Sequence, residues 1–147
     1  MKYIFFTAFF CLSQAFALTP FSLENIKAVN VTVLHKGDVI SEEQQEMIKK
    51  NLEKRLTVLG IQTQSQRFAN LLLKINIMKL DNKSIGHVTL LLGEEALIHR
   101  ETPTEGMVIG YQKDDLFEID TLQSDLNDTI DYLFEEFADQ YKEENTP

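Results

Sequence analysis

Two residue types in this 147-residue chain could carry chemistry, namely a single cysteine and three histidines. Cys11 could be a lipid-anchor site, a redox centre or a metal ligand. His87 and His99 lie on segments that read as hairpin-related strands, so their rings could bind a metal ion together with Glu101. No tight ligand spacing such as His-Glu-x-x-His accompanies them. The alternative for both histidines is an ordinary polar position on a solvated sheet face.

The surroundings of Cys11 indicate an export signal. Lys2 precedes an apolar run over residues 3–12, and Ala15 and Ala17 supply the small residues that a signal peptidase accepts before a cleavage point. A lipid anchor needs a small residue directly before its cysteine, whereas Phe10 stands there. The run is also shorter than the roughly 20 residues that span a bilayer. We therefore expect a signal peptide over residues 1–17, cleaved after Ala17, and a periplasmic or secreted mature chain without a stable membrane anchor.

The net charge of the mature chain limits the classes of partner that we expect it to bind. The full chain has a net charge of −9, and removal of residues 1–17 takes away one lysine, Lys2, which leaves −10. Such a balance disfavours nucleic acid and anionic membrane surfaces as partners. With Cys11 removed, no cysteine is left for disulfides or thiolate chemistry. We expect one domain over residues 18–147, no cofactor, and an envelope protein or an apolar ligand as partner.

Alternating and helical spacings predict the first half of the fold. Val29, Val31 and Val33 alternate with polar residues, as in a half-buried strand. Ser41-Glu42-Glu43-Gln44 has the form of a capping box for a helix that Gly60 ends. Residues 69–78 then form the strongest predicted strand, with Ala69, Leu71, Leu73, Ile75 and Ile77 on its buried face.

The second half reads as further strands and a closing helix. Turn residues at 81–84 lead into a strand over 85–92, with Val88, Leu90 and Leu92 facing inward. Residues 93–95 are predicted to turn, followed by strands at 96–100 and 107–112. A long helix after Asp120 or Thr121 closes the chain; its apolar stripe comprises Leu122, Leu126, Ile130, Leu133, Phe137 and Tyr141. Its other side is acidic, as expected of a solvated face or a site for calcium or a basic partner.

This order predicts an α+β two-layer sandwich. The first two strands flank a helix and should be parallel, while the later strands add antiparallel pairs. Both helices carry one apolar stripe, so both should lie on one sheet face. We expect a mixed sheet of four to five strands with two helices on one face, in the order strand-helix-strand-strand-strand-strand-helix.

A resemblance covers nearly the whole mature chain. The segments LENIKAVNVTVL, KKNLEKRLTVLGIQTQSQRFANLLLKINIMKL and SIGHVTLLLGEEALIHRE, followed by the final amphipathic helix, resemble small bacterial envelope domains of the LptE, CsgG and TolB amino-terminal kind. The resemblance lies in a pattern of apolar residues and one glycine turn, without a catalytic or binding motif. It implies a non-enzymatic part in envelope assembly or transport. Many such proteins are lipid-anchored, and this chain departs from that pattern.

The sheet face away from the helices is the candidate partner face. It should combine polar residues with an apolar border that also includes Leu80, and it reads either as a water-facing surface or as a docking site. We expect a non-catalytic binding or accessory protein of the cell envelope that uses this face or a sheet edge. The alternative is a metal-dependent or hydrolytic enzyme around His87 and His99. The candidate face comprises Asn30, Thr32, Leu72, Lys74, Asn76, Met78, His87, Thr89 and Leu91.

Overall fold

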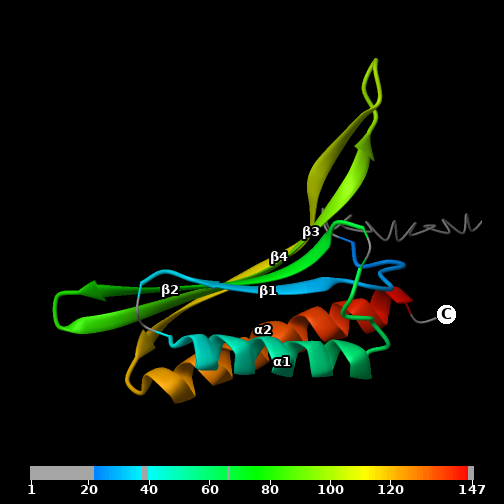
Figure 1. Ribbon diagram of the computed structural model, residues 1–147. Coiled ribbons are helices and arrows are strands. Elements are labelled where there is room, and N and C mark those ends of the chain that lie inside the picture. The colour runs from blue at the N-terminus through cyan, green and yellow to red at the C-terminus, as the bar shows by residue number, and fades with distance from the viewer. Residues whose placement is uncertain (1–21, 38–39, 66, 146–147) are drawn as a thin grey trace, which may run out of the picture.

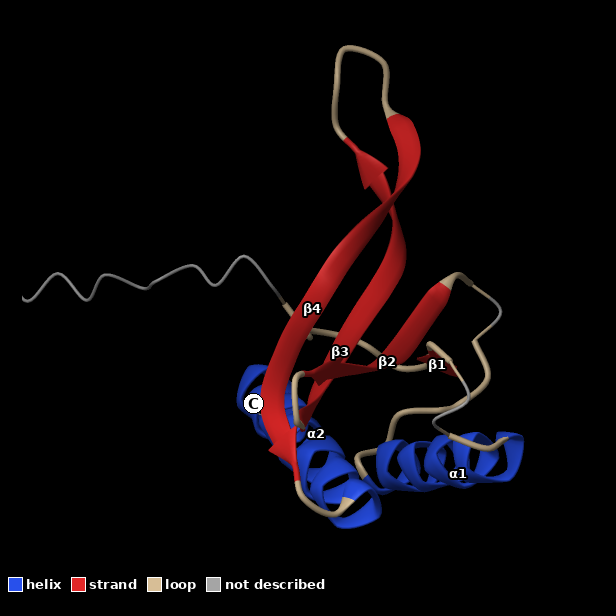
Figure 2. Cartoon of the chain, turned by 90° about the vertical axis from the view of Figure 1, so that its left-hand side faces the viewer, coloured by secondary structure: helices blue, strands red, loops and turns tan. Residues whose placement is uncertain are grey.

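The chain folds into two layers, a four-stranded sheet with two helices against one of its faces (Figure 1, Figure 2). The computed structural model describes residues 22–37, 40–65 and 67–145, so the expected signal peptide lies outside the described residues. The predicted α+β class with a mixed sheet is confirmed. Strand β1 is parallel to β2, and the remaining neighbours in the order β1-β2-β3-β4 are antiparallel. The elements are β1 (Asn30–His35), α1 (Glu42–Val58), β2 (Ala69–Leu80), β3 (Lys83–Ile98), β4 (Thr104–Ile119) and α2 (Leu122–Asn145).

Helix α1 begins and ends where the sequence predicts. The Ser41 hydroxyl accepts a hydrogen bond from the backbone N–H of Gln44, and the Gln44 side chain accepts one from the backbone N–H of Ser41. This is the capping box. Gly60 follows the helix with a φ of 83°, a left-handed conformation that glycine adopts without strain.

The core lies between the inner sheet face and the two helices. The predicted inward faces are confirmed by burial of the valines of β1 and of Leu71, Leu73 and Ile75 in β2, whereas Ile77 is only partly buried. From α2, Leu133 and Phe137 are fully buried, and the Phe137 ring meets the Tyr111 ring edge-on at 5.2 Å between centroids. This packing fixes which sheet face is covered, and so which face stays open.

Helix α2 starts directly after Thr121, as the sequence predicts, but an unexpected group stabilises its start. The carboxylate of Asp125 accepts hydrogen bonds from the backbone N–H groups of Asp120 and Thr121, both at 2.8 Å. A negative charge in the first turn also suits the helix dipole.

Strands β3 and β4 are longer than predicted, which is the main departure from the expected fold. The predicted turn at residues 93–95 is wrong, because β3 continues to Ile98 and merges the strands expected at 85–92 and 96–100. Leu92 pairs with Tyr111 while Gly93 pairs with Ile109, so Gly110 is an extra residue in β4. Such a β-bulge bends a hairpin without ending its strands.

Beyond the bulge, the two strands leave the sandwich as a two-stranded ribbon that we call the arm (Figure 1, Figure 2). Residues 93–98 pair with residues 104–109, and residues 99–103 form the loop at its tip. The pairing of β2 with β3 stops at Ala69 and Glu94, so β2 does not extend along the arm. Within the described chain, no hydrophobic side chain between residues 93 and 110 is buried.

Candidate functional site

The candidate partner face is the outer face of the sheet, opposite the helices (Figure 2). Strand register places its nine predicted residues together, since Thr32 pairs with Leu72, Leu72 with Leu91, and Asn76 with His87. Their side chains therefore point to the same side of β1, β2 and β3. The structure gives this face a polar half over the middle of β2 and β3 and an apolar half at the arm, while Met78 and Leu116 are 53% and 64% exposed toward the other end of the sheet.

The polar half lies over the middle of β2 and β3. His87 Nε2 is 3.1 Å from Oδ2 of Asp114, which β4 contributes. Thr89 is only 7% exposed, although its side chain lies on the outer face. Lys74 is exposed beside it. This half is a polar surface in which the His87 ring and the Asp114 carboxylate are paired.

The side chain of Asn30 stabilises the fold and is not free to bind a partner, because both of its polar atoms bond to the backbone of Ser65. Its side-chain nitrogen donates to the carbonyl of Ser65 at 3.3 Å, and its side-chain oxygen accepts from the N–H of Ser65 at 3.1 Å. These two bonds hold the segment before β2 against β1. Alternation in the sequence predicts that Asn30 faces outward. It does not predict that the side chain is already hydrogen-bonded to Ser65.

The apolar half is a hollow of about 360 Å³ where the arm meets the sheet. Gly93 has no side chain to fill the space between Leu91 and the arm, and the larger side chains around it form the walls. Exposed apolar side chains continue from the hollow along the arm, because Ile109, Met107 and Leu97 are 50%, 55% and 54% exposed. The hollow is lined by Thr32, Phe68, Asn70, Leu72, Leu91, Gly93, Met107, Val108 and Ile109.

Sequence reasoning found three residues of this hollow, Thr32, Leu72 and Leu91, and missed those that the arm supplies. The sequence predicts a strand at residues 107–112. Because it also predicts a turn at residues 93–95, it gives this strand no neighbour with which residues 107–109 could pair. Met107 and Ile109 could therefore not be assigned to a face. The available signal was the pair of glycines, Gly93 and Gly110, because glycine inside a strand often marks a bulge.

The two histidines of the alternative enzyme site are not neighbours. His87 lies in the sheet and His99 follows the end of the same strand, in the loop at the tip of the arm. At about 3.3 Å per strand residue, the twelve steps from His87 to His99 cover roughly 40 Å along the chain. The expectation that they lie on paired strands is wrong, because β3 does not turn between them. The two rings cannot bind the same metal ion in this fold.

The acidic face of α2 is largely used by the fold. The Asp131 carboxylate pairs with Arg55 of α1 at 2.5 Å, and Glu136 pairs with Lys113 of β4. Asp125 holds the helix start, as described above. The Asp131 and Glu136 ion pairs tie α2 to α1 and β4.

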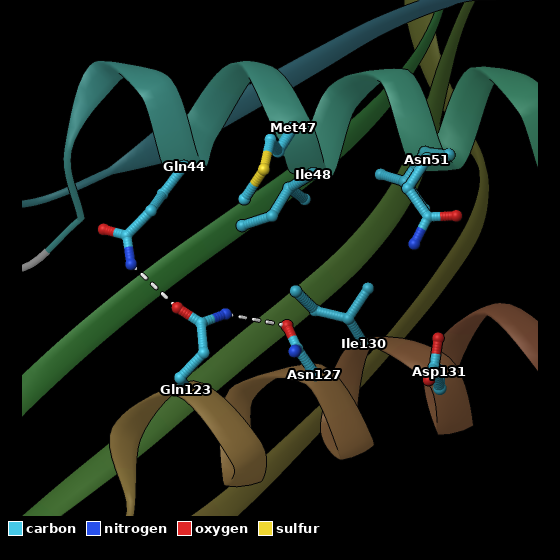
Figure 3. Close-up of a pocket in the computed structure, with 9 residues that line it drawn as sticks. Gln44, Met47, Ile48, Asn51, Gln123, Asn127, Ile130 and Asp131 are labelled. Atoms are coloured by element: carbon cyan, nitrogen blue, oxygen red, sulfur yellow. Dashed lines mark hydrogen bonds between the residues drawn. The ribbon is translucent and has the colours of Figure 1, made fainter.

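A second groove lies between the two helices (Figure 3). Its amide side chains bond to one another, with Gln44 donating to Gln123 at 2.7 Å and Gln123 donating to Asn127 at 3.0 Å. Ile48 and Ile130 form apolar parts of its lining. The hydrogen bond between Gln44 and Gln123 joins the two walls of this groove. No such side-chain bond joins the described residues that line the hollow beside the arm.

No family model, curated protein or solved structure matches this chain. Neither described helix is long and apolar enough to cross a membrane.

Proposed function

We propose that this chain is an exported, non-catalytic binding or accessory protein of the cell envelope that engages its partner through the outer sheet face. The observation that carries the proposal is the hollow of about 360 Å³, which continues into exposed apolar side chains of the arm. Exposed apolar side chains that gather in one patch mark interaction sites more often than scattered ones do. The sequence features at residues 1–17 support export.

No geometry among the described residues favours the enzyme alternative. Its two histidines are separated along β3, and the nearest carboxylate to His87, that of Asp114, sits on an open surface. A general base needs a substrate position and a second group aimed at it.

Site-specific photo-crosslinking in envelope preparations of the native host tests the proposal. A photo-reactive residue at position 107, on the arm, should give a discrete adduct. The matched control is position 47 on α1, since Met107 and Met47 are 55% and 58% exposed. Equal adducts at both positions, or none at position 107, would contradict binding through the arm and hollow. The intact mass of the purified chain reports export, because a chain cleaved after Ala17 begins at Leu18.

A further inference from the structure

The outer face of the arm carries an ordered row of side chains. On β4, Glu105, Met107 and Ile109 stand at alternate positions and therefore on one face. Ile109 pairs with Gly93, at the floor of the hollow, and Met107 pairs with Glu95. The row therefore runs from an acid near the tip to apolar side chains at the hollow.

The arm lacks the support that a two-stranded ribbon normally needs. An isolated hairpin is only marginally stable in water, and stability requires a third strand or a packed layer. Both described helices lie under the sheet, away from the arm (Figure 1). The apolar side chains of this row are about half exposed. A partner covering this face would remove them from water and stabilise the ribbon.

The charges of the arm decide what kind of partner fits. Neither Glu95 nor Glu105 has an ion-pair partner within the described part of the chain, whereas Asp114 and Glu118 on the same strand face are paired with His87 and Lys83. The net charge of −9 disfavours a second copy of this chain as the occupant. A basic group beside Glu105 and Glu95 would complete the row. Lys74 lies beyond Leu72, at the opposite side of the hollow, and therefore does not neutralise the negative charge of Glu95 and Glu105.

We propose that the arm and hollow bind an extended segment of a partner protein in which a basic residue is followed, two and four positions later, by apolar residues. This inference rests on the proposed function and names the class of partner. Alternate residues of an extended chain are about 6.6–6.8 Å apart, which matches the spacing of the row on β4. The basic residue lies over Glu105 and Glu95, the first apolar residue over Met107, and the second enters the hollow at Gly93.

Peptide titration followed by amide NMR tests this proposal on the mature chain. The probe is the hexapeptide Lys-Thr-Leu-Thr-Leu-Thr with blocked ends. Two controls replace its lysine by glutamate or both leucines by serine. We expect the lysine–leucine peptide to shift the amides of Gly93, Gly106 and Gly110, and both controls to bind more weakly. Added salt should weaken the binding of the two peptides that carry lysine, and should not weaken that of the glutamate peptide.

Two substitutions locate the charge contribution on the arm. Glu105→Gln and Glu95→Gln should each weaken binding of the lysine peptide about two- to fivefold, as expected for one cross-strand ion pair. Glu101→Gln, an exposed acid in the tip loop, is the matched control and should leave the affinity unchanged.

Three outcomes overturn the proposal. Equal binding of the glutamate–leucine peptide would refute the basic requirement while leaving the apolar binding face of the proposed function intact. Shifts that depend on protein concentration without peptide would identify a second copy as the occupant. Stronger shifts with a single-chain lysolipid than with any peptide would identify an acyl chain instead. Absence of an adduct at position 107 in the crosslinking experiment would, by contrast, contradict the proposed function itself.

Discussion

Tyr111 is the residue whose environment departs most from an ordinary one. It is 3% exposed, and its hydroxyl has no hydrogen-bond partner among the described residues. Burial raises the pKa of Tyr111 to about 12, with smaller contributions from Glu136 and Tyr132. A buried hydroxyl without a partner costs free energy, while the ring below it packs against Phe137. The ring of Tyr111 therefore raises the free energy of unfolding, whereas its buried hydroxyl lowers it.

Tyr111→Phe should therefore leave the free energy of unfolding unchanged or raise it by about 1 kcal/mol. The unfolded phenol ionises near its ordinary pKa of 10 and the folded one near 12, so the wild-type chain should also lose stability relative to the variant as pH rises above 10. Urea unfolding at neutral and alkaline pH measures both effects. Tyr141→Phe is the contrast, because its hydroxyl donates to the carbonyl of Ile26 at 3.2 Å and its removal should lower the free energy of unfolding. A loss of more than about 1 kcal/mol in Tyr111→Phe would indicate a hidden partner, such as a bound water.

At the scale of elements, the sequence predicts what depends on short-range periodicity. The capping box at Ser41, the glycine turn at Gly60 and the buried faces of β1, β2 and α2 all follow from spacing within one element, and the structure confirms them. The continuation of β3 through Gly93 does not follow from such spacing. It depends on which residue of β4 lies opposite: the glycines at 93 and 110 can signal a bulge, but only the pairing of the two strands shows that Gly110 is the extra residue.

The same limit explains the partial success at the site. The outward residues of β1, β2 and β3 were assigned correctly because alternation alone decides their face. The walls that β4 supplies require the register between two strands. Gly86 shows the same dependence at the far end of the hairpin, where a Cβ atom would lie 2.4 Å from the ring of its cross-strand partner Phe117. Only Gly fits there without moving that ring.

Glu94 provides a test of the bend between sheet and arm. It is partly buried, its carboxylate lies beside Gly110 at the bulge, and burial raises its pKa above the ordinary 4.5. The charged form is therefore disfavoured in the folded chain. The cost to stability is absent below pH 4.5, grows as pH rises through the folded pKa, and is complete above it.

Glu94→Gln should accordingly raise the free energy of unfolding at neutral pH, and the gain should disappear as pH falls through 4.5. Urea unfolding across this range measures the difference between variant and wild type. Glu95→Gln, the exposed neighbour on the opposite face of β3, is the control and should show a much smaller change. A gain that stays constant with pH would mean that the carboxylate is not the source.

At the scale of the whole molecule, the structure separates a stable body from a projecting arm. Every buried hydrophobic residue of the described chain lies before residue 93 or after residue 110. The two helices and the inner sheet face close the body without help from the arm (Figure 1). Stability and binding should therefore be separable by shortening the hairpin.

Replacement of residues 95–107 by Asn-Gly should shorten the arm while keeping the fold. Glu94 and Val108 are cross-strand partners, and a two-residue turn is the commonest link between paired strands. Because no core side chain is removed, we expect cooperative unfolding with a change of about 1 kcal/mol or less. Phe137→Ala, which empties the centre of the core, should cost about 3–5 kcal/mol under the same conditions. With the photo-reactive residue at position 72 instead, on the β2 wall of the hollow, the shortened chain should also lose its adduct, since Met107 is removed from the opposite wall. Loss of cooperative unfolding in the shortened chain would show that the arm is part of the folded body, and binding would then have to be assigned to another surface.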